Sequence, residues 1–209
     1  MHHHERLHRG PELMDRLATI RVCICGAGAL GANITESLAR CGFKALRVID
    51  RDRVEERNLS TQPWQRSDIG AQKAKILANT LYRAVGATVE WKTETLDASN
   101  VEKLVAGADL VVDTFDNSAS RRAVAEYAAG SGTPCLHAGM AAGFAEVIWN
   151  EAYRIPSDKN DDVCDYPLAR NLVMLTVAIA CESVISFAAT GDRRSFSVTL
   201  GDLAISPFE

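Results

Sequence analysis

The sequence lacks several features that define common protein classes. Its 209 residues contain no C-x-x-C pair and no run of basic residues, and their formal net charge is −4 at pH 7. This acidic balance gives no electrostatic reason to expect nucleic acid as a partner. The opening, MHHHERLHRG, lacks the apolar core of a secretory signal. We therefore expect a cytoplasmic protein with reduced thiols whose main partner is not a nucleic acid.

Two stretches could suggest other classes. Four histidines fall within the first eight residues, and we expect a flexible terminus or an expression remnant there rather than a metal site. The run over 171–189, NLVMLTVAIACESVISFAA, is long enough to raise the question of a membrane span. Glu182 near its middle argues against a span. We interpret the run as a buried helix at a core or a subunit interface.

Apolar runs of strand length alternate with segments of helix length as far as His137. We expect strands over 20–25, 45–49, 88–91, 110–113 and 133–137, and helices over 29–41, 70–85, 101–106 and 118–130. This β-α-β-α alternation predicts a parallel sheet with right-handed crossovers. The expected fold class is therefore α/β, with a Rossmann-like doubly wound sheet.

The pattern changes after His137. We expect strand material over 143–155, then a polar loop, the apolar helix and a strand near 196–200. This order predicts that the C-terminal part of the sheet is antiparallel. We expect an N-terminal arm over 1–18 and a single α/β domain over 19–209.

A glycine-rich loop follows the first expected strand. The segment GAGALG is a G-x-G-x-x-G pattern with glycines at Gly26, Gly28 and Gly31. The first permits a tight turn, the second lets a phosphate approach the backbone, and the third lets helix and strand pack closely. Asp50 ends the next expected strand, where a carboxylate can accept hydrogen bonds from ribose hydroxyls. The loop predicts an adenine nucleotide without saying which one.

The chain after Asp50 is more polar than a hydride-transfer enzyme requires. DRDRVEERNLSTQ is followed by Lys73 at the start of a helix, and DTFDNSASRR follows a later strand. Because the carboxyl ends of parallel strands converge on one crevice, Asp50, Lys73 and Asp116 are expected to approach one nucleotide. An aspartate can hold Mg²⁺ on phosphate oxygens, and a lysine can neutralise charge on a phosphorus under attack. This set indicates phosphoryl or nucleotidyl transfer from ATP.

Four motifs resemble, in the same order, those of the ThiF/MoeB/HesA superfamily of adenylyltransferases related to ubiquitin-activating enzymes: GAGALG, IDRDRVEERNLSTQ, IGAQKA and DTFDNSASRR. The resemblance implies that a carboxylate attacks the α-phosphorus of Mg·ATP, giving an acyl-adenylate and pyrophosphate. The carboxylate is usually the C-terminal Gly-Gly carboxylate of a ubiquitin-like or sulfur-carrier protein. ATP and Mg²⁺ are the implied cofactors, and a homodimer is the implied assembly.

The resemblance also implies roles for matching residues. The implied nucleotide-binding residues are Gly26, Gly28, Gly31, Asp50, Asp52, Asn58, Gln62, Lys73 and Asn117. Asn58 and Gln62 would position the triphosphate, and Lys73 would stabilise charge in the transition state. Asp116 would hold Mg²⁺ as the metal ligand. Asn117 and Arg121 would brace the loop that carries Asp116, although Asp52 and Arg121 could instead serve only in local salt bridges.

The chain departs from the family pattern in its arginines. Many members have an arginine where this chain has Thr61, and Arg57 or Arg66 is a candidate replacement. A further arginine of the family comes from the amino terminus of the other subunit. Arg6 and Arg9 are the candidates for that residue here.

Cysteine usage departs as well. Many relatives carry two C-x-x-C pairs, and their absence here predicts no structural zinc. In relatives, a cysteine before the long apolar helix can form a thioester or acyl-disulfide with the activated carrier, and Cys164 falls about there. A nucleophilic thiolate needs stabilising, whereas the neighbouring Asp161, Asp162 and Asp165 work against it. We keep Cys164 as a catalytic candidate beside Lys73 and Asp116.

Adenylation of a carboxylate is the leading interpretation, and a variant in the same superfamily activates a carboxylate on a modified tRNA nucleoside. Two other classes remain open. An NAD-dependent oxidoreductase rests on the glycine loop and Asp50, but His137 is the only histidine beyond the N-terminal stretch, and such a residue is more often packed than catalytic. A degenerate binding module, which keeps the fold without turnover, is supported by Thr61.

Overall fold

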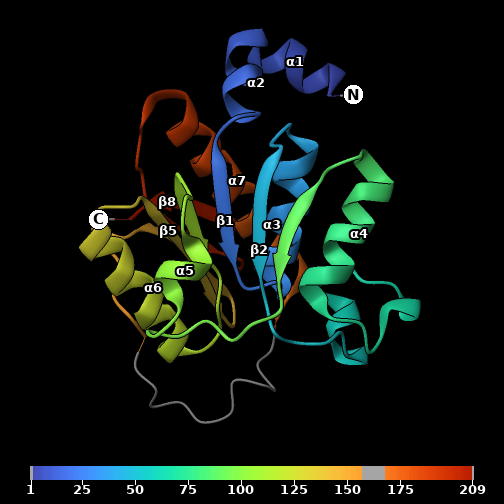
Figure 1. Cartoon of the computed structure of the whole chain (residues 1–209). Coiled ribbons are helices and arrows are strands. Elements are labelled where there is room, and N and C mark those ends of the chain that lie inside the picture. The colour runs from blue at the N-terminus through green and yellow to red at the C-terminus, as the bar shows by residue number, and fades with distance from the viewer. Residues whose placement is uncertain (1, 157–167, 209) are drawn as a thin grey trace.

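The computed structural model describes residues 2–156 and 168–208, and its centre is one eight-stranded sheet (Figure 1). The strands are β1 Arg21–Cys25, β2 Ala45–Ile49, β3 Val89–Lys92, β4 Leu110–Asp113, β5 Cys135–Ala141, β6 Phe144–Trp149, β7 Phe196–Thr199 and β8 Ala204–Pro207. Their order across the sheet is β3-β2-β1-β4-β5-β6-β7-β8. The strands from β3 to β5 pair in parallel, and those from β5 to β8 pair antiparallel. The predicted doubly wound sheet with an antiparallel C-terminal part is confirmed.

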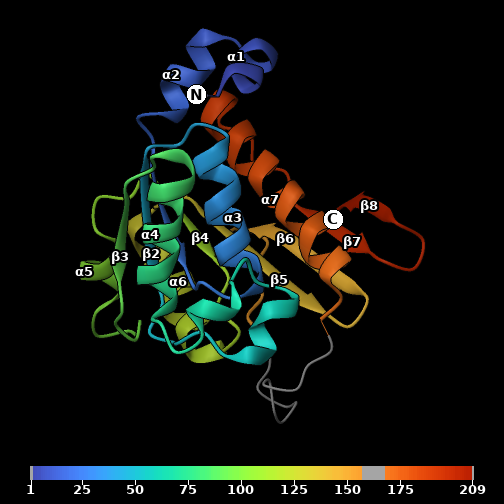
Figure 2. The same cartoon turned by 90° about the vertical axis from the view of Figure 1, so that its right-hand side faces the viewer.

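Helices cover both faces of this sheet. They are α3 Ala29–Arg40, α4 Lys73–Val85 and α7 Arg170–Thr190 on one face, and α5 Val101–Val105 and α6 Ser118–Ser131 on the other. Figure 2 shows α5 on one side of the sheet and α3 and α7 on the other. Val22 and Ile24 of β1 face the first core, whereas Cys23 and Cys25 face the second. Burial on both faces explains why the parallel strands are continuous apolar runs.

The N-terminal arm is folded, which corrects the expectation of a flexible terminus. Two short helices, α1 His3–Arg9 and α2 Pro11–Leu17, lie at the amino ends of the parallel strands (Figure 1). Met14 and Leu17 are buried in the main core. Arg16 donates hydrogen bonds to the carbonyl groups of Ala188 and Ala189 at the end of α7. The arm therefore packs against α7, and the domain boundary at residue 18 remains a prediction.

Other differences from the expected elements are local. Helix α4 begins at Lys73, because the chain first makes a turn at Gly70, whose φ is 86°, and a bridge between Arg53 and Gln72. Strand β6 ends at Trp149, and the chain turns there. Strand β8 and the 3-10 helices η1 Glu56–Ser60 and η2 Arg66–Asp68 have no counterpart among the expected elements. None of these differences changes the topology of the sheet.

Helix α7 is long and apolar enough to cross a membrane by length and composition. Its most apolar 18-residue window has a mean hydropathy of 2.1, and 56% of that window is buried inside the protein. The helix packs against α3 and against β5, β6 and β7. These contacts are those of a core helix, as the sequence predicted.

Candidate functional site

The parallel register brings the ends of three strands to one level. Cys25 at the end of β1 pairs with Ile49 of β2 on one side and with Asp113 of β4 on the other. The loops that follow these three strands therefore leave the sheet side by side. They carry Gly26, Asp50 and the residues after β4, at the point where the strand order reverses. Open α/β sheets bind ligands in the crevice at this position.

The glycine loop has the tight geometry that its pattern predicts. Gly26 has a φ of 99°, a conformation that favours glycine. A Cβ atom on Gly31 would lie 2.0 Å from the Gly26 carbonyl oxygen and 2.5 Å from Thr114 Oγ1. A Cβ atom on Gly28 would meet nothing within 4 Å, so the backbone there is open to a ligand. Helix α3 starts just after Gly28, and its first N–H groups and dipole favour a phosphate.

Asp50 connects the glycine loop to the segment after β2. Its Oδ2 accepts a hydrogen bond from the Ala27 N–H at 2.6 Å, and its Oδ1 accepts one from the Asp52 N–H at 2.7 Å. Burial raises the pKa of the Asp50 carboxyl, and Lys73 and the two N–H groups offset part of that rise. Each carboxylate oxygen keeps lone pairs that can accept ribose hydroxyls.

Lys73 stands at the start of α4 and is only 7% exposed. Its Nζ lies 3.5 Å from Oδ2 of Asp52, whose side chain is 56% exposed. The Lys73 N–H also donates to the Asp52 carbonyl at 2.9 Å, which fixes the start of α4 beside the β2 loop. The expected salt bridge of Asp52 is therefore present. Lys73 therefore places a positive charge beside Asp50, where it can act on a phosphate bound at the glycine loop.

Asn58 and Gln62 lie in and just after η1, and both use their side-chain oxygens locally. Asn58 Oδ1 accepts from the Glu55 N–H at 2.9 Å, and Gln62 Oε1 accepts from Trp64 Nε1 at 2.6 Å. Within the described residues, neither side-chain NH₂ group makes a hydrogen bond. These NH₂ groups are donors suited to phosphate oxygens.

Thr61, which stands where many family members have an arginine, is buried. Its carbonyl oxygen accepts a hydrogen bond from Asn33 Nδ2 at 2.9 Å. This bond fastens the segment to α3. Of the two candidate replacement arginines, Arg57 is in an ion pair with Glu55 at 2.7 Å, and Arg66 is exposed in η2.

The segment after β4 presents Asp116 to solvent. Thr114 Oγ1 donates to the Cys25 carbonyl at 2.9 Å, and Asn117 caps α6 by accepting from the Ser120 N–H at 2.9 Å. Asp116 lies between these two fixed points and is exposed. Its carboxylate makes no hydrogen bond with any other described residue. Carboxylate oxygens are ligands that Mg²⁺ prefers, and those of Asp116 are not engaged by other described residues.

The two candidate arginines of the N-terminal arm do not lie at this crevice within the single chain. Arg9 pairs with Glu182 of α7 and with Glu5, and Arg6 lies 4.0 Å from Asp15, both at the opposite end of the sheet (Figure 1). Neither arginine can reach the crevice of its own chain. Cys164 lies outside the described residues. Over the ranges 2–156 and 168–208, no group of three or more metal-binding side chains occurs.

A buried polar network lies under the Asp116 loop, and sequence analysis found only part of it. His137 is 1% exposed, and its Nδ1 and Nε2 each lie 2.9 Å from an oxygen, of Asp113 and Asn150 respectively. The prediction that His137 is packed is therefore confirmed. Asp113 and Tyr153 were missed. An aspartate at the end of the apolar run LVVD was the available signal, because a buried carboxylate needs a partner.

The fold and this crevice are those of an α/β protein of the doubly wound class. The ThiF family model matches residues 4–181, and the chain belongs to this family. Over 131 residues the chain is 38% identical to SAMP-activating enzyme E1 of Haloferax volcanii, with 61% of this chain and 48% of that enzyme covered. It is 33% identical over 132 residues to the sulfur carrier protein ThiS adenylyltransferase of Bacillus subtilis, with 61% and 39% covered.

Solved structures show the same fold. MccB of E. coli, crystallised with ATP, has a TM-score of 0.80 at 18% identity, over 94% of this chain and 66% of MccB. Another MccB structure, with SeMet MccA, has a TM-score of 0.82 at 18% identity. The present chain spans about half or less of the two curated relatives named above.

Proposed function

We propose that this chain adenylates a carboxylate with Mg·ATP and releases pyrophosphate. The observation that carries this proposal is the position of Lys73, a buried ammonium beside Asp50 and the open glycine loop. An ammonium in this position can stabilise the negative charge that develops when a phosphorus is attacked. The names of the relatives, an E1 and a ThiS adenylyltransferase, support the same reaction class.

The nucleotide would be held by three parts of the crevice. The first N–H groups of α3 and the open backbone at Gly28 would receive phosphate oxygens. Asp50 would accept the ribose hydroxyls, and the NH₂ groups of Asn58 and Gln62 would donate to the triphosphate. Asp52 would keep Lys73 in place, and Asn117 would hold the start of α6.

The reaction breaks one bond and makes one bond at the α-phosphorus. A carboxylate oxygen of the substrate attacks, the bond to the β-phosphate oxygen breaks, and pyrophosphate leaves with the bonding electrons. Negative charge builds on the α-phosphate and bridging oxygens, and Lys73 Nζ would neutralise it in a site partly screened from water. No proton transfer is needed, because the nucleophile is already ionised at neutral pH.

Asp116 is the residue that would hold Mg²⁺, since its carboxylate is exposed and free of hydrogen bonds within the described chain. When bound, Mg²⁺ supplies neutralising charge to the leaving pyrophosphate. Structural zinc is not part of the proposal.

The proposed substrate is the C-terminal Gly-Gly carboxylate of a ubiquitin-like or sulfur-carrier protein, in a reducing cytoplasm. The printed names of the relatives support this class, and a carboxylate on a modified tRNA nucleoside is the variant to be tested beside it. Cys164 is proposed as the residue that could take the activated acyl group afterwards. An oxidoreductase is disfavoured, because His137 is buried and both of its ring nitrogens are engaged.

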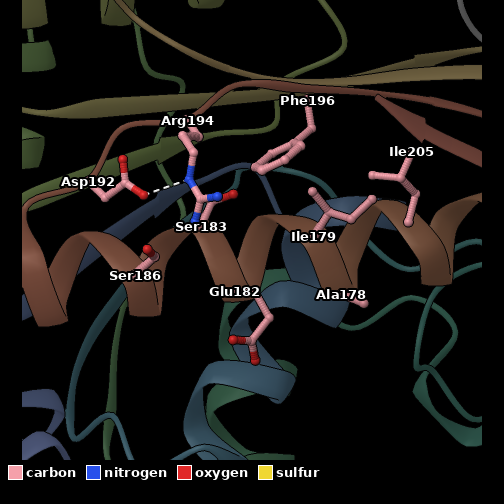
Figure 3. A pocket seen from close by; sticks show the side chains of 9 residues that line it. All are labelled: Ala178, Ile179, Glu182, Ser183, Ser186, Asp192, Arg194, Phe196 and Ile205. Atoms are coloured by element: carbon pink, nitrogen blue, oxygen red, sulfur yellow. Dashed lines mark hydrogen bonds and ion pairs between the residues drawn. The ribbon is translucent and has the colours of Figure 1, made fainter. Parts of the chain in front are cut away.

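We also propose a homodimer formed through the outer face of α7. A hollow of about 270 Å³ lies between α7 and strands β7 and β8, where Ile179, Phe196 and Ile205 approach one another (Figure 3). Ser183 lines this hollow, and its buried Oγ has no hydrogen-bond partner among the described residues. Arg6 and Arg9 do not reach the crevice of their own chain. In a dimer, the N-terminal arm could instead bring one of them to the partner's crevice.

Thermal stabilisation by nucleotides tests the proposed reaction class. Mg·ATP at 100 times its Kd should add about 2.7 kcal/mol to the free energy of unfolding, and NADH should add nothing. Asp116→Ala should weaken the effect of Mg·ATP. Pyrophosphate exchange into ATP, dependent on a Gly-Gly carrier, would then establish turnover. Stabilisation by NADH alone would support the oxidoreductase, and binding without exchange would support the degenerate module.

A further inference from the structure

Arg121 is a buried cation at the centre of the network under the Asp116 loop. It is 8% exposed, and its guanidinium donates to four oxygens or lies close to them. Nε donates to the Phe115 carbonyl, and Nη2 donates to the Ala138 carbonyl at 2.9 Å. Nη1 donates to the Tyr153 hydroxyl at 2.9 Å and lies 3.7 Å from Asp113 Oδ2. The guanidinium therefore joins α6 to β4, β5 and the turn after β6.

Tyr153 is held in this network on two sides. Its hydroxyl accepts from Arg121, and its ring stacks on the His137 ring with centroids 3.7 Å apart and an interplanar angle of 4°. His137 in turn lies against the carboxylate of Asp113 at 2.9 Å. The Tyr153 ring is therefore fixed by a buried neighbour, and its hydroxyl holds one edge of the guanidinium.

The Phe115 peptide depends on the same network. The Phe115 N–H donates to Asp113 Oδ1 at 3.1 Å, and its carbonyl oxygen accepts from Arg121. Asp116 follows directly, is exposed, and makes no side-chain hydrogen bond within the described residues. The backbone position of Asp116, and with it the space that its carboxylate can reach, is therefore set by the peptide before it and by the α6 cap after it.

We propose that Tyr153 is a positioning residue, which acts through Arg121 and the Phe115 carbonyl to aim the Asp116 carboxylate at the Mg²⁺ of the bound nucleotide. This inference rests on the proposed function. Without the hydroxyl, Nη1 of a buried cation loses an acceptor, and the guanidinium shifts toward Asp113. The Phe115 carbonyl and the Asp116 backbone then lose their fixed position.

The test is the Mg²⁺ dependence of ATP binding in Tyr153→Phe, which removes one oxygen and keeps the ring. Mg²⁺ is titrated at a fixed ATP concentration, and thermal stabilisation is the readout. A hydrogen bond to a charged group corresponds to a change of about 10- to 150-fold, and we expect the Mg²⁺ midpoint to rise by up to that amount. ATP binding in EDTA, where no free Mg²⁺ is present, should be unchanged. A general loss of structure would weaken that binding as well.

Tyr127→Phe is the matched control. Tyr127 lies on α6, is partly buried in the second core, and its hydroxyl makes no hydrogen bond in the described part of the chain. Gly139→Ala is an independent probe, because its Cβ would lie 3.3 Å from Arg121 Nη2 and would displace the guanidinium without removing an acceptor. Gly139→Ala should also raise the Mg²⁺ midpoint. It replaces Tyr153→Phe as the test variant if Tyr153→Phe does not fold.

A double-mutant cycle with Asp116→Ala identifies the route of the effect. If Tyr153 acts through Asp116, removing the hydroxyl in the Asp116→Ala background should change the Mg²⁺ midpoint no further. Equal midpoints for Tyr153→Phe and Tyr127→Phe, or additive effects in the cycle, would overturn the inference while the adenylyltransferase stands. Absence of any Mg·ATP stabilisation in the wild type would instead overturn the proposed function, and the inference with it.

Discussion

Gly31 lies so close to Gly26 that a Cβ atom on Gly31 would stand 2.0 Å from the Gly26 carbonyl oxygen. The neighbour is backbone, which cannot rotate away as a side chain could. The third glycine of the loop is therefore a packing requirement, because it lets α3 start directly against the end of β1. The second glycine, Gly28, has open space around it and is a requirement of the ligand instead.

We predict that Gly31→Ala and Gly28→Ala separate these two requirements. Gly31→Ala should lower the free energy of unfolding by about 3 kcal/mol or more, at the upper end of overpacking effects. Gly28→Ala should change it by less than about 1 kcal/mol and yet weaken stabilisation by Mg·ATP. Urea unfolding with and without nucleotide measures both. Equal stability of the two variants would contradict the packing argument.

Lys73 gives the second prediction. In Lys73→Gln, pyrophosphate exchange should fall about 10²- to 10³-fold, the usual loss when one preorganised charge-stabilising donor is removed. Unfolding should change little, because Asp52 is more than half exposed and such pairs contribute about 1 kcal/mol or less. Lys75→Gln, exposed on the same helix, is the control and should keep its exchange rate. Unchanged exchange in Lys73→Gln would remove the lysine from the mechanism.

The parallel part of the fold could be predicted from the sequence, because each buried strand is a short apolar run bounded by polar or glycine residues. Ala45–Ile49 and Leu110–Asp113 were predicted at their observed bounds for this reason. The topology then places the ends of β1, β2 and β4 together, so the positions of Gly26, Asp50 and Asp116 followed as well. Local pattern and fold-level rules agree in this region.

The rest depended on contacts between residues distant in the chain. Helices α1 and α2 are seven residues each, which is too short to be stable alone, and they fold against α7 through pairs such as Arg9 with Glu182. Strand β8 has mostly exposed residues and no alternating pattern to reveal it. Tyr153 contacts Arg121 across 32 positions of sequence, and no periodic pattern in the sequence predicts a contact at that separation.

The buried pair of Asp113 and Arg121 gives a prediction on pH. Burial alone would raise the pKa of the Asp113 carboxyl, but Arg121 and His137 outweigh burial and hold it below its usual range. A lowered acid pKa stabilises the fold above the unfolded value of about 3.9, and this stability is lost as pH falls through the folded value. Asp113→Asn should therefore cost about 3–5 kcal/mol at pH 7, because it leaves a buried cation without its counter-charge.

The difference between wild type and Asp113→Asn should shrink as the pH falls below about 4, because the unfolded wild-type chain then binds a proton that the folded chain, with its lowered Asp113 pKa, does not yet bind. Urea unfolding between pH 3 and pH 7 measures this convergence. Asp109→Asn is the control, since Asp109 pairs with Arg21 at the surface and should contribute about 1 kcal/mol or less. A constant difference across the range would show that charge at Asp113 is not the cause.

Cys164 gives a prediction that separates adenylation from any later acyl transfer. Cys164→Ala should leave pyrophosphate exchange unchanged, because an acyl-adenylate forms without a thiol. It should abolish any thioester or acyl-disulfide with the carrier, seen as loss of a reductant-sensitive adduct on a gel. Loss of exchange in this variant would contradict the proposed assignment of Lys73 and Asp116 as sufficient for the first step.

The outer face of α7 gives the last prediction. Helix α7 has one charged side chain, Glu182, between its ends, although its outer face is exposed in the single chain, and the hollow beside it continues onto β8 at the sheet edge. A helix that is apolar all round is normally buried, so a second copy should cover it. Sedimentation should give twice the 22.7 kDa of one chain. Ile205→Glu, at a position 52% exposed, should yield monomers, whereas Tyr82→Glu, 65% exposed on α4, should not.

The same variant tests whether the crevice needs its partner's arm. If it does, the Ile205→Glu monomers should lose pyrophosphate exchange, and mixing them with Asp116→Ala chains should restore it. If the wild type is monomeric, a different protein must cover the outer face of α7, and Arg9 has no catalytic role.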